Sequence, residues 1–140
     1  MLSNDYIAGF FDADGSVGIY KRQAKNAGAY QVCIAIANSG YHGRIICNEL
    51  VERFGGTVTT QKAKKSTHRD TFWFRMNGME KVKIFLQEIS PHLIIKKDQA
   101  LACLEFIEEW EKMPRYNKTP EQLKYMQEME DHVKQLKVLS

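Results

Sequence analysis

The sequence has few cysteines and no long hydrophobic run, and each shortage excludes a class of protein. Its three cysteines, Cys33, Cys47 and Cys103, are an odd number without C-x-x-C spacing, so we expect neither a disulfide framework nor a zinc site. No apolar run approaches the roughly 20 residues that a bilayer span requires. Met1 precedes Leu2 and a polar stretch rather than a basic, apolar leader. We therefore expect an intracellular protein that is neither secreted nor embedded in a membrane.

The composition is that of a folded protein. Of the 140 residues, 44% are hydrophobic and 26% are charged, which differs from the profile of disordered chains. A chain of this length buries about two-thirds of its surface on folding. Because the sequence shows neither an internal repeat nor a linker, we expect one domain over residues 1–140.

Positive charge is unevenly distributed along the chain. The formal net charge is +3, but residues 15–75 contain ten Lys and Arg against three acids, a local charge of +7 that leaves −4 elsewhere. The basic part has the pattern of strands and hairpin loops, and the acidic excess lies mainly in the C-terminal helices. One fold could therefore present a positive face to a polyanion. A solvated mosaic of charges is the alternative interpretation.

Hydrophobic periodicity predicts helices and strands in the order α-β-β-α-β-β-α-α-α. A short helix ends near Asp14, where Asp-Gly follows an apolar stretch. The other expected elements are strands at 16–22 and 31–36, a helix at 44–54, strands at 57–62 and 71–76, and helices at 79–89, at 96–110 and after Pro120. This predicts an α+β fold with an αββαββα core, a four-stranded antiparallel sheet and additional C-terminal helices over about 96–137.

The face of the sheet opposite the helices mixes hydrogen-bonding, aromatic and small side chains. Such a face, flanked by basic loops, suits contacts to base edges in a DNA major groove, with phosphate contacts outside. An ordinary solvated sheet face is the alternative. The residues expected to bind DNA are Tyr20, Arg22, Lys25, Gln31, Cys33, Thr57, Thr59, Gln61, Lys62, Lys64, Lys65, Arg69, Thr71, Trp73 and Arg75.

The most specific pattern in the sequence is IAGFFDADGS at residues 7–16. Gly9 and Ala13 are four residues apart, so they share one helical face on which small side chains let a second helix approach closely. Asp14 ends the helix, where the dipole already favours a cation, and this suggests a metal ligand. A lone D-x-D-G is otherwise most often a helix-ending turn. An EF-hand is excluded because Ser16 and Gln23 stand where its loop needs acidic ligands.

This segment resembles the motif of the LAGLIDADG homing endonucleases, with Ile for the first Leu and Phe-Phe for Leu-Ile. The similarity covers residues 4–136, because the order of elements and the segment PHLIIKKDQA also follow the family. The chain resembles the single-motif, homodimeric group. The resemblance implies an interface between two motif helices, made by Ala8, Gly9, Asp12 and Ala13, with Asp12 mainly in helix packing.

The resemblance also implies a set of active-site residues. Asp14 and the backbone carbonyl of Ala13 would bind the metal, and Lys96, which without this context would be a solvated lysine, would serve the active site. Asn38 stands where a Gln is often found and would help to order the catalytic water. His42 and Arg44 compete for one further basic position, because the expected connecting loop is about one residue longer than in the family.

The activity implied is a metal-dependent, staggered double-strand break in DNA at a long, roughly palindromic site. Mg²⁺ would be the metal, with Mn²⁺ a second candidate and Ca²⁺ supporting binding without efficient turnover. The partners would be double-stranded DNA and a second copy of the chain, in a bacterial or archaeal cytoplasm or an organelle with its own genome. The alternative is a non-cleaving protein of the same fold, either a maturase that binds intron RNA or a transcription factor.

Overall fold

The computed structural model describes residues 2–22 and 29–140, so Lys25 lies outside the described part. The chain begins with α1 (Asn4–Asp14), passes directly into β1 (Gly15–Lys21), and continues with β2 (Tyr30–Ser39), α2 (Gly40–Phe54), β3 (Thr57–Gln61) and β4 (Thr71–Met76). It ends with α3 (Met79–Ile89), a short 3-10 helix η2 (Ser90–His92), α4 (Lys97–Glu111) and α5 (Pro120–Leu139). The predicted α+β fold and element order are confirmed.

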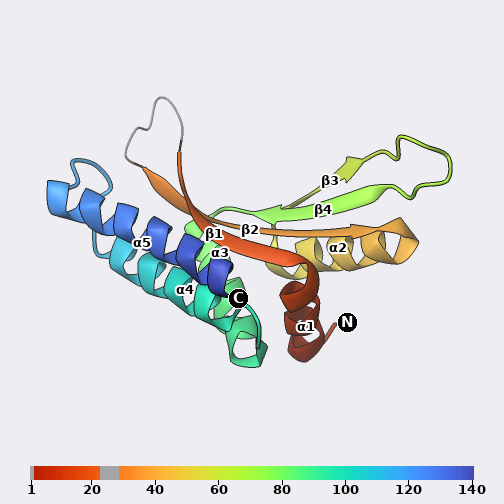
Figure 1. The fold of residues 1–140 in the computed structure, drawn as a ribbon, viewed down its shortest axis with the longest axis horizontal. Helices are drawn as coiled ribbons and strands as arrows, with labels where there is room; N and C mark the ends of the chain where they lie inside the picture. Colours follow the sequence, from red (N-terminus) through yellow and green to blue (C-terminus); the bar gives the residue numbers. More distant parts are fainter. Residues whose placement is uncertain (1, 23–28) are drawn as a thin grey trace.

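The four strands form one antiparallel sheet with the order β1-β2-β4-β3. Strict alternation along β2 sends Val32, Ile34 and Ile36 into the core, where they meet apolar side chains from the helices. Figure 1 shows the helices gathered below the sheet and its upper face left uncovered. The sheet therefore has one buried face and one face available to a partner.

The second strand and the helix after it differ from the prediction. β2 extends to Ser39, and α2 begins at Gly40 rather than near Arg44, so the expected connecting loop is absent. Gly40 makes the direct junction because its φ of 78° lies in the left-handed region that favours glycine. Its N–H donates to the carbonyl of Asp70, which ties the junction to the start of β4.

The last helix covers the edge of the sheet. α5 starts with a capping box between Thr119 and Gln122 and packs against α4 and β1. Glu130, which is buried, accepts a hydrogen bond of 3.1 Å from the backbone N–H of Lys21 in β1. A charged side chain thus satisfies a donor on the edge strand.

All three cysteines are free thiols, as expected. Cys47 and Cys103 are buried in the core, and Cys33 is partly exposed on the sheet. Within the described residues, no helix combines the length and apolar character needed to cross a membrane.

Candidate active site and nucleic-acid interface

The C-terminal end of α1 forms the centre of the candidate active site. Ser3 caps the helix by accepting a hydrogen bond of 3.1 Å from the N–H of Tyr6, and Phe11 anchors its last turn in the core. Gly15 begins β1 immediately after the helix. A Cβ at this glycine would clash with the buried Phe11 ring, so only glycine fits the turn. The turn leaves the carboxylate of Asp14 exposed at the end of the helix.

Asn38 meets Asp14 from the end of β2. Its Nδ2 donates a hydrogen bond of 3.3 Å to Oδ2 of Asp14, and its Oδ1 accepts one of 2.8 Å from the N–H of Ser39. A Cβ on Gly43 would lie 2.9 Å from this Oδ1, so α2 packs closely against the amide. The amide is therefore held at both ends and orients the carboxylate of Asp14.

Lys96 lies under the same helix end, as the residue that precedes α4. Its Nζ donates to the carbonyls of Phe11 at 3.2 Å and Asp12 at 3.0 Å, and also to that of Gly15. Burial lowers the pKa of Lys96 from its ordinary value, while the carboxylates of Asp12 and Asp14 oppose that shift. The ammonium thus stabilises the carbonyl end of α1, a bonding role that the sequence did not indicate.

Asp12 fixes the segment that carries Lys96. Its two carboxylate oxygens accept hydrogen bonds from the backbone N–H groups of Ile94, at 2.8 Å, and Lys96, at 3.0 Å. The carboxylate therefore packs α1 against the start of α4 within one protomer. This agrees with a helix-packing residue, and it makes Asp12 a positioning residue for the lysine.

His42 and Arg44 both lie exposed near the start of α2. The ring of His42 packs edge-on against Tyr41, with centroids 5.6 Å apart, and the guanidinium of Arg44 lies 6.0 Å from the same ring. Within residues 2–22 and 29–140, no hydrogen bond or ion pair joins either side chain to Asp14. Both side chains are therefore candidates for the basic position that the resemblance implies.

The oxygen atoms at the end of α1 fit a hard divalent cation. A carboxylate and backbone carbonyls are the ligands that Mg²⁺ and Ca²⁺ prefer, and several carbonyls here already converge on a cationic ammonium. No group of three or more His, Cys, Asp or Glu side chains suited to a metal occurs among the described residues. The oxygen ligands at this helix end are therefore one carboxylate and backbone carbonyls.

The open sheet face carries the side chains predicted to bind DNA. The strand register aligns Ala35 with Arg75 and Arg75 with Thr57, and it aligns Trp73 with Thr59, so these residues share one face. The guanidinium of Arg75 stacks 4.8 Å from the Trp73 ring centroid and donates to Oγ1 of Thr59 at 3.3 Å. The same face also holds Tyr20, Gln31, Cys33, Gln61 and Thr71, and Arg22 follows β1 directly.

The β3–β4 hairpin ends in a basic loop. Asp70 organises its base by accepting hydrogen bonds from the N–H of Ala63, at 2.8 Å, and from Nζ of Lys62, at 3.3 Å, and these two donors lower the pKa of Asp70. A hollow of about 280 Å³ lies at the tip. Ala63 and His68 line it together with six residues that the sequence predicts to bind DNA, namely Gln61, Lys62, Lys64, Lys65, Arg69 and Thr71.

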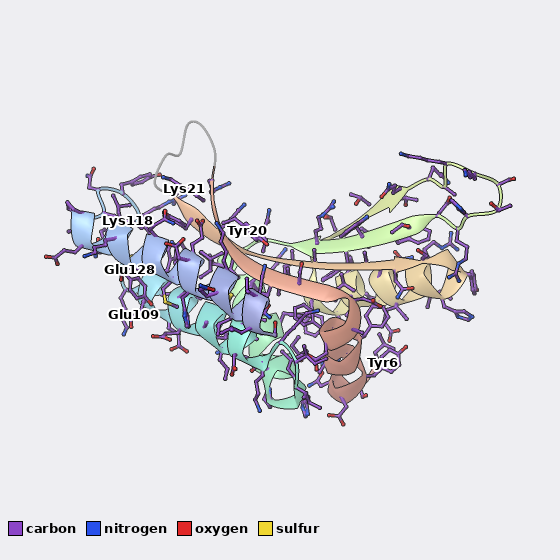
Figure 2. The ribbon with its side chains drawn as sticks, in the orientation of Figure 1. Tyr6, Tyr20, Lys21, Glu109, Lys118 and Glu128 are labelled. Atoms are coloured by element: carbon purple, nitrogen blue, oxygen red, sulfur yellow. The ribbon has the colours of Figure 1, made fainter. Side chains whose placement is uncertain are left out.

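One side of α1 bears an exposed stripe of small and aromatic residues. Tyr6, which Figure 2 shows pointing away from α4 and α5, stacks on Phe10 at 6.3 Å, and Gly9 and Ala13 continue the stripe. An added Cβ on Gly9 would meet nothing within 4 Å. Ala8 was expected at the interface, but its side chain is fully buried in the protomer's own core and cannot reach a second protomer.

Comparison with known proteins adds a family and a set of similar folds. A family profile described as LAGLIDADG-like domain matches residues 2–90, whereas no curated protein sequence matches the chain. The homing endonuclease I-CvuI, in complex with the I-CreI target and 2 mM Mg, is similar over 95% of this chain and 80% of its own, with 23% identity and a TM-score of 0.72. I-CvuI has also been solved with its own target and 2 mM Ca.

Two further solved structures show the same fold. The archaeal intron-encoded homing endonuclease I-Vdi141I, complexed with DNA, has a TM-score of 0.72 and 19% identity over 95% of this chain and 82% of its own. The meganuclease I-SmaMI, bound to uncleaveable DNA, has a TM-score of 0.71 and 14% identity over 92% of this chain and 44% of its own.

Proposed function

The chain belongs to the LAGLIDADG-like domain family, and from this we propose that it is a homing endonuclease that makes a staggered double-strand break in DNA. Its substrate is a long, pseudo-palindromic site, cut by metal-dependent hydrolysis of one phosphodiester in each strand. Residues 1–140 act as one endonuclease domain, in an intracellular compartment that contains DNA.

The observation that carries this proposal is the meeting of Asp14, Asn38 and Lys96 at one helix end. Asp14 ends α1, Asn38 lies at the end of β2, and Lys96 precedes α4. The Asn38 amide donates to the Asp14 carboxylate. The Lys96 ammonium donates to carbonyls in the last turn of α1. A structural turn needs no such convergence. A site for phosphoryl chemistry needs charge, orientation and a fixed backbone at one place.

Divalent metal binding fits this helix end. Asp14 and the carbonyl of Ala13 would hold Mg²⁺ or Mn²⁺, and the bound ion would neutralise the charge that develops on the scissile phosphate. Solved complexes of I-CvuI that contain Mg or Ca support a divalent ion in this fold.

The chain's own residues then have separate tasks. Asn38 orients the carboxylate of Asp14, and its amide would help to order the attacking water. Lys96 holds the carbonyl end of α1 in place and adds positive charge next to the position of the scissile phosphate. The carboxylate of Asp12 fixes the backbone that carries Lys96, because it accepts hydrogen bonds from the N–H groups of Ile94 and Lys96.

Two copies of the chain are needed to cut both strands. The exposed stripe on α1 allows the motif helices of two protomers to pack closely through Gly9 and Ala13, which brings two copies of Asp14 near each other across the DNA. The two open sheet faces then read the two half-sites, and the basic hairpin tips contact phosphates.

Selection of cleaved sites from a random duplex library with magnesium tests the proposal. We expect one long site with approximate two-fold symmetry and 3′ overhangs at its centre. Binding without cleavage, by protein whose Asp14 is intact, would instead favour a non-cleaving DNA-binding or RNA-binding protein.

A further inference from the structure

A hollow of about 320 Å³ lies on the open sheet face, between β1, β2 and the end of β4. Its floor is made of Cys33 and Ala35, two adjacent outward positions of β2. Ser16, Gln31 and Asn77 stand around it. The hollow therefore has a small, weakly polar floor within a polar rim.

One wall of the hollow is set by Tyr20. The Tyr20 ring leans back over Gly18, where an added Cβ would lie 2.6 Å from its hydroxyl. Lys137 of α5 secures this orientation, because its Nζ donates to the Tyr20 hydroxyl at 3.3 Å and lies 5.5 Å from the ring centroid. Figure 2 shows Tyr20 on β1, above α5. The absent side chain at position 18 leaves room for the ring over β1, beside Cys33 of the neighbouring strand, and the cation from α5 holds it there.

The opposite wall is Arg75, which is also held in place. Its guanidinium is fixed by the Trp73 ring and by Thr59, both on the side away from the hollow. The side chains of both walls are thus restrained before any partner binds. Restrained side chains lose little conformational entropy when a ligand group fills the hollow.

The floor offers poor hydrogen-bonding groups. A thiol is a weak donor and acceptor, and burial raises the pKa of Cys33, so it stays protonated near neutral pH, although Arg22 acts in the opposite direction. Ala35 presents only a methyl group. In the major groove, thymine is the base whose outer edge carries an apolar group, its 5-methyl, and small apolar side chains are its usual partners.

We propose that this hollow receives the 5-methyl group of one thymine in each half-site, which makes Cys33 and Ala35 specificity-determining residues. The inference rests on the proposed function, because it presumes that this sheet face lies in a DNA major groove. Arg75, beside the hollow, would read the neighbouring base pair.

The test replaces thymine by deoxyuridine, which removes only the methyl group. Starting from a recovered target, each thymine is replaced in turn, symmetrically in both half-sites, and binding is measured by fluorescence anisotropy in calcium on duplexes shown by gel to be uncut. At one symmetry-related pair we expect Kd to rise about fourfold per half-site, the effect of one buried methyl group. Placing 5-methylcytosine at that pair should restore part of the affinity relative to cytosine.

Two variants test whether the difference in Kd between thymine and deoxyuridine arises in the hollow. Ala35→Val adds two methyl groups to the floor at a strand position that tolerates a branched side chain, so it should abolish the difference between thymine and deoxyuridine. The control Thr60→Val exchanges a hydroxyl for a methyl group on the other side of the sheet, at an exposed position of β3, and should leave the difference unchanged.

The results separate this inference from the proposed function. Sequence-selective binding in which no thymine methyl matters, or a methyl effect that persists in Ala35→Val, overturns the hollow's role while the endonuclease proposal stands. Absence of any sequence-selective duplex binding refutes the proposed function and this inference with it.

Discussion

Asn38 donates a hydrogen bond of 3.3 Å to the carboxylate of Asp14, although the two residues are 24 positions apart. The bond joins the end of β2 to the end of α1 and leaves the carboxylate exposed. A carboxylate that is fixed by one amide but still open to solvent can serve as a ligand without first losing an ion pair.

Asp14→Asn should abolish cleavage and leave DNA binding within about tenfold of the wild type. The change removes the charge that attracts the metal but few contacts to DNA. Gel-based cleavage in magnesium and anisotropy in calcium measure the two properties separately. Magnesium-dependent cutting by this variant would place the metal site elsewhere.

Lys96→Met should reduce both stability and cleavage. It keeps the aliphatic stem but leaves carbonyls of α1 without their donor, which costs about 1–3 kcal/mol of unfolding free energy. Urea denaturation measures the loss. The matched control is Lys97→Met at the exposed neighbouring position, and an equal loss in that variant would argue against the carbonyl contacts.

Gly9→Leu should convert a dimer into monomers without unfolding the protomer. An added side chain at Gly9 meets nothing within the protomer, so only close approach of a second helix is blocked. Sedimentation velocity and circular dichroism measure assembly and folding. Gly78→Leu, also in open space but at the start of α3, should remain dimeric. A Gly9→Leu dimer with full activity would place the interface on another surface.

Replacing Lys64 and Lys65 by Ala should weaken binding similarly for all DNA sequences. If each lysine neutralises one phosphate, the slope of log K against log salt becomes shallower by about 0.9 per lost contact. Titrations at several salt concentrations provide the slope. An unchanged slope would mean that the hairpin tip does not touch DNA.

Arg75→Ala should relax the preference at one base pair in each half-site, at positions related by the two-fold axis. Arginine reads guanine through two hydrogen bonds, which contribute about 1–3 kcal/mol of discrimination. In a symmetric dimer each side chain acts twice. Profiling of cleaved sites measures the change, and relaxation confined to one half-site would rule out a symmetric active species.

Much of the architecture could be predicted from local pattern. The two-residue alternation in β2 and β4 and the helical spacing in α3 are strong signals, because each element has one buried face whose period is set by backbone geometry. The junction before α2 was predicted wrongly. Gly40 there takes a left-handed conformation and bonds to Asp70, a residue 30 positions away, and local propensity carries no information about such a contact.

The sequence alone determined the motif, the family resemblance, the order of the elements and which strand residues face outward, since all of these depend on neighbours in the chain. Only the tertiary structure decided that Lys96 binds the carbonyls of α1, that Ala8 is enclosed in the core, and that Lys137 holds Tyr20. Each of these depends on side chains more than 80 residues apart or on the packing of several elements. Their distances are set by how the helices stack on the sheet, which no local pattern specifies.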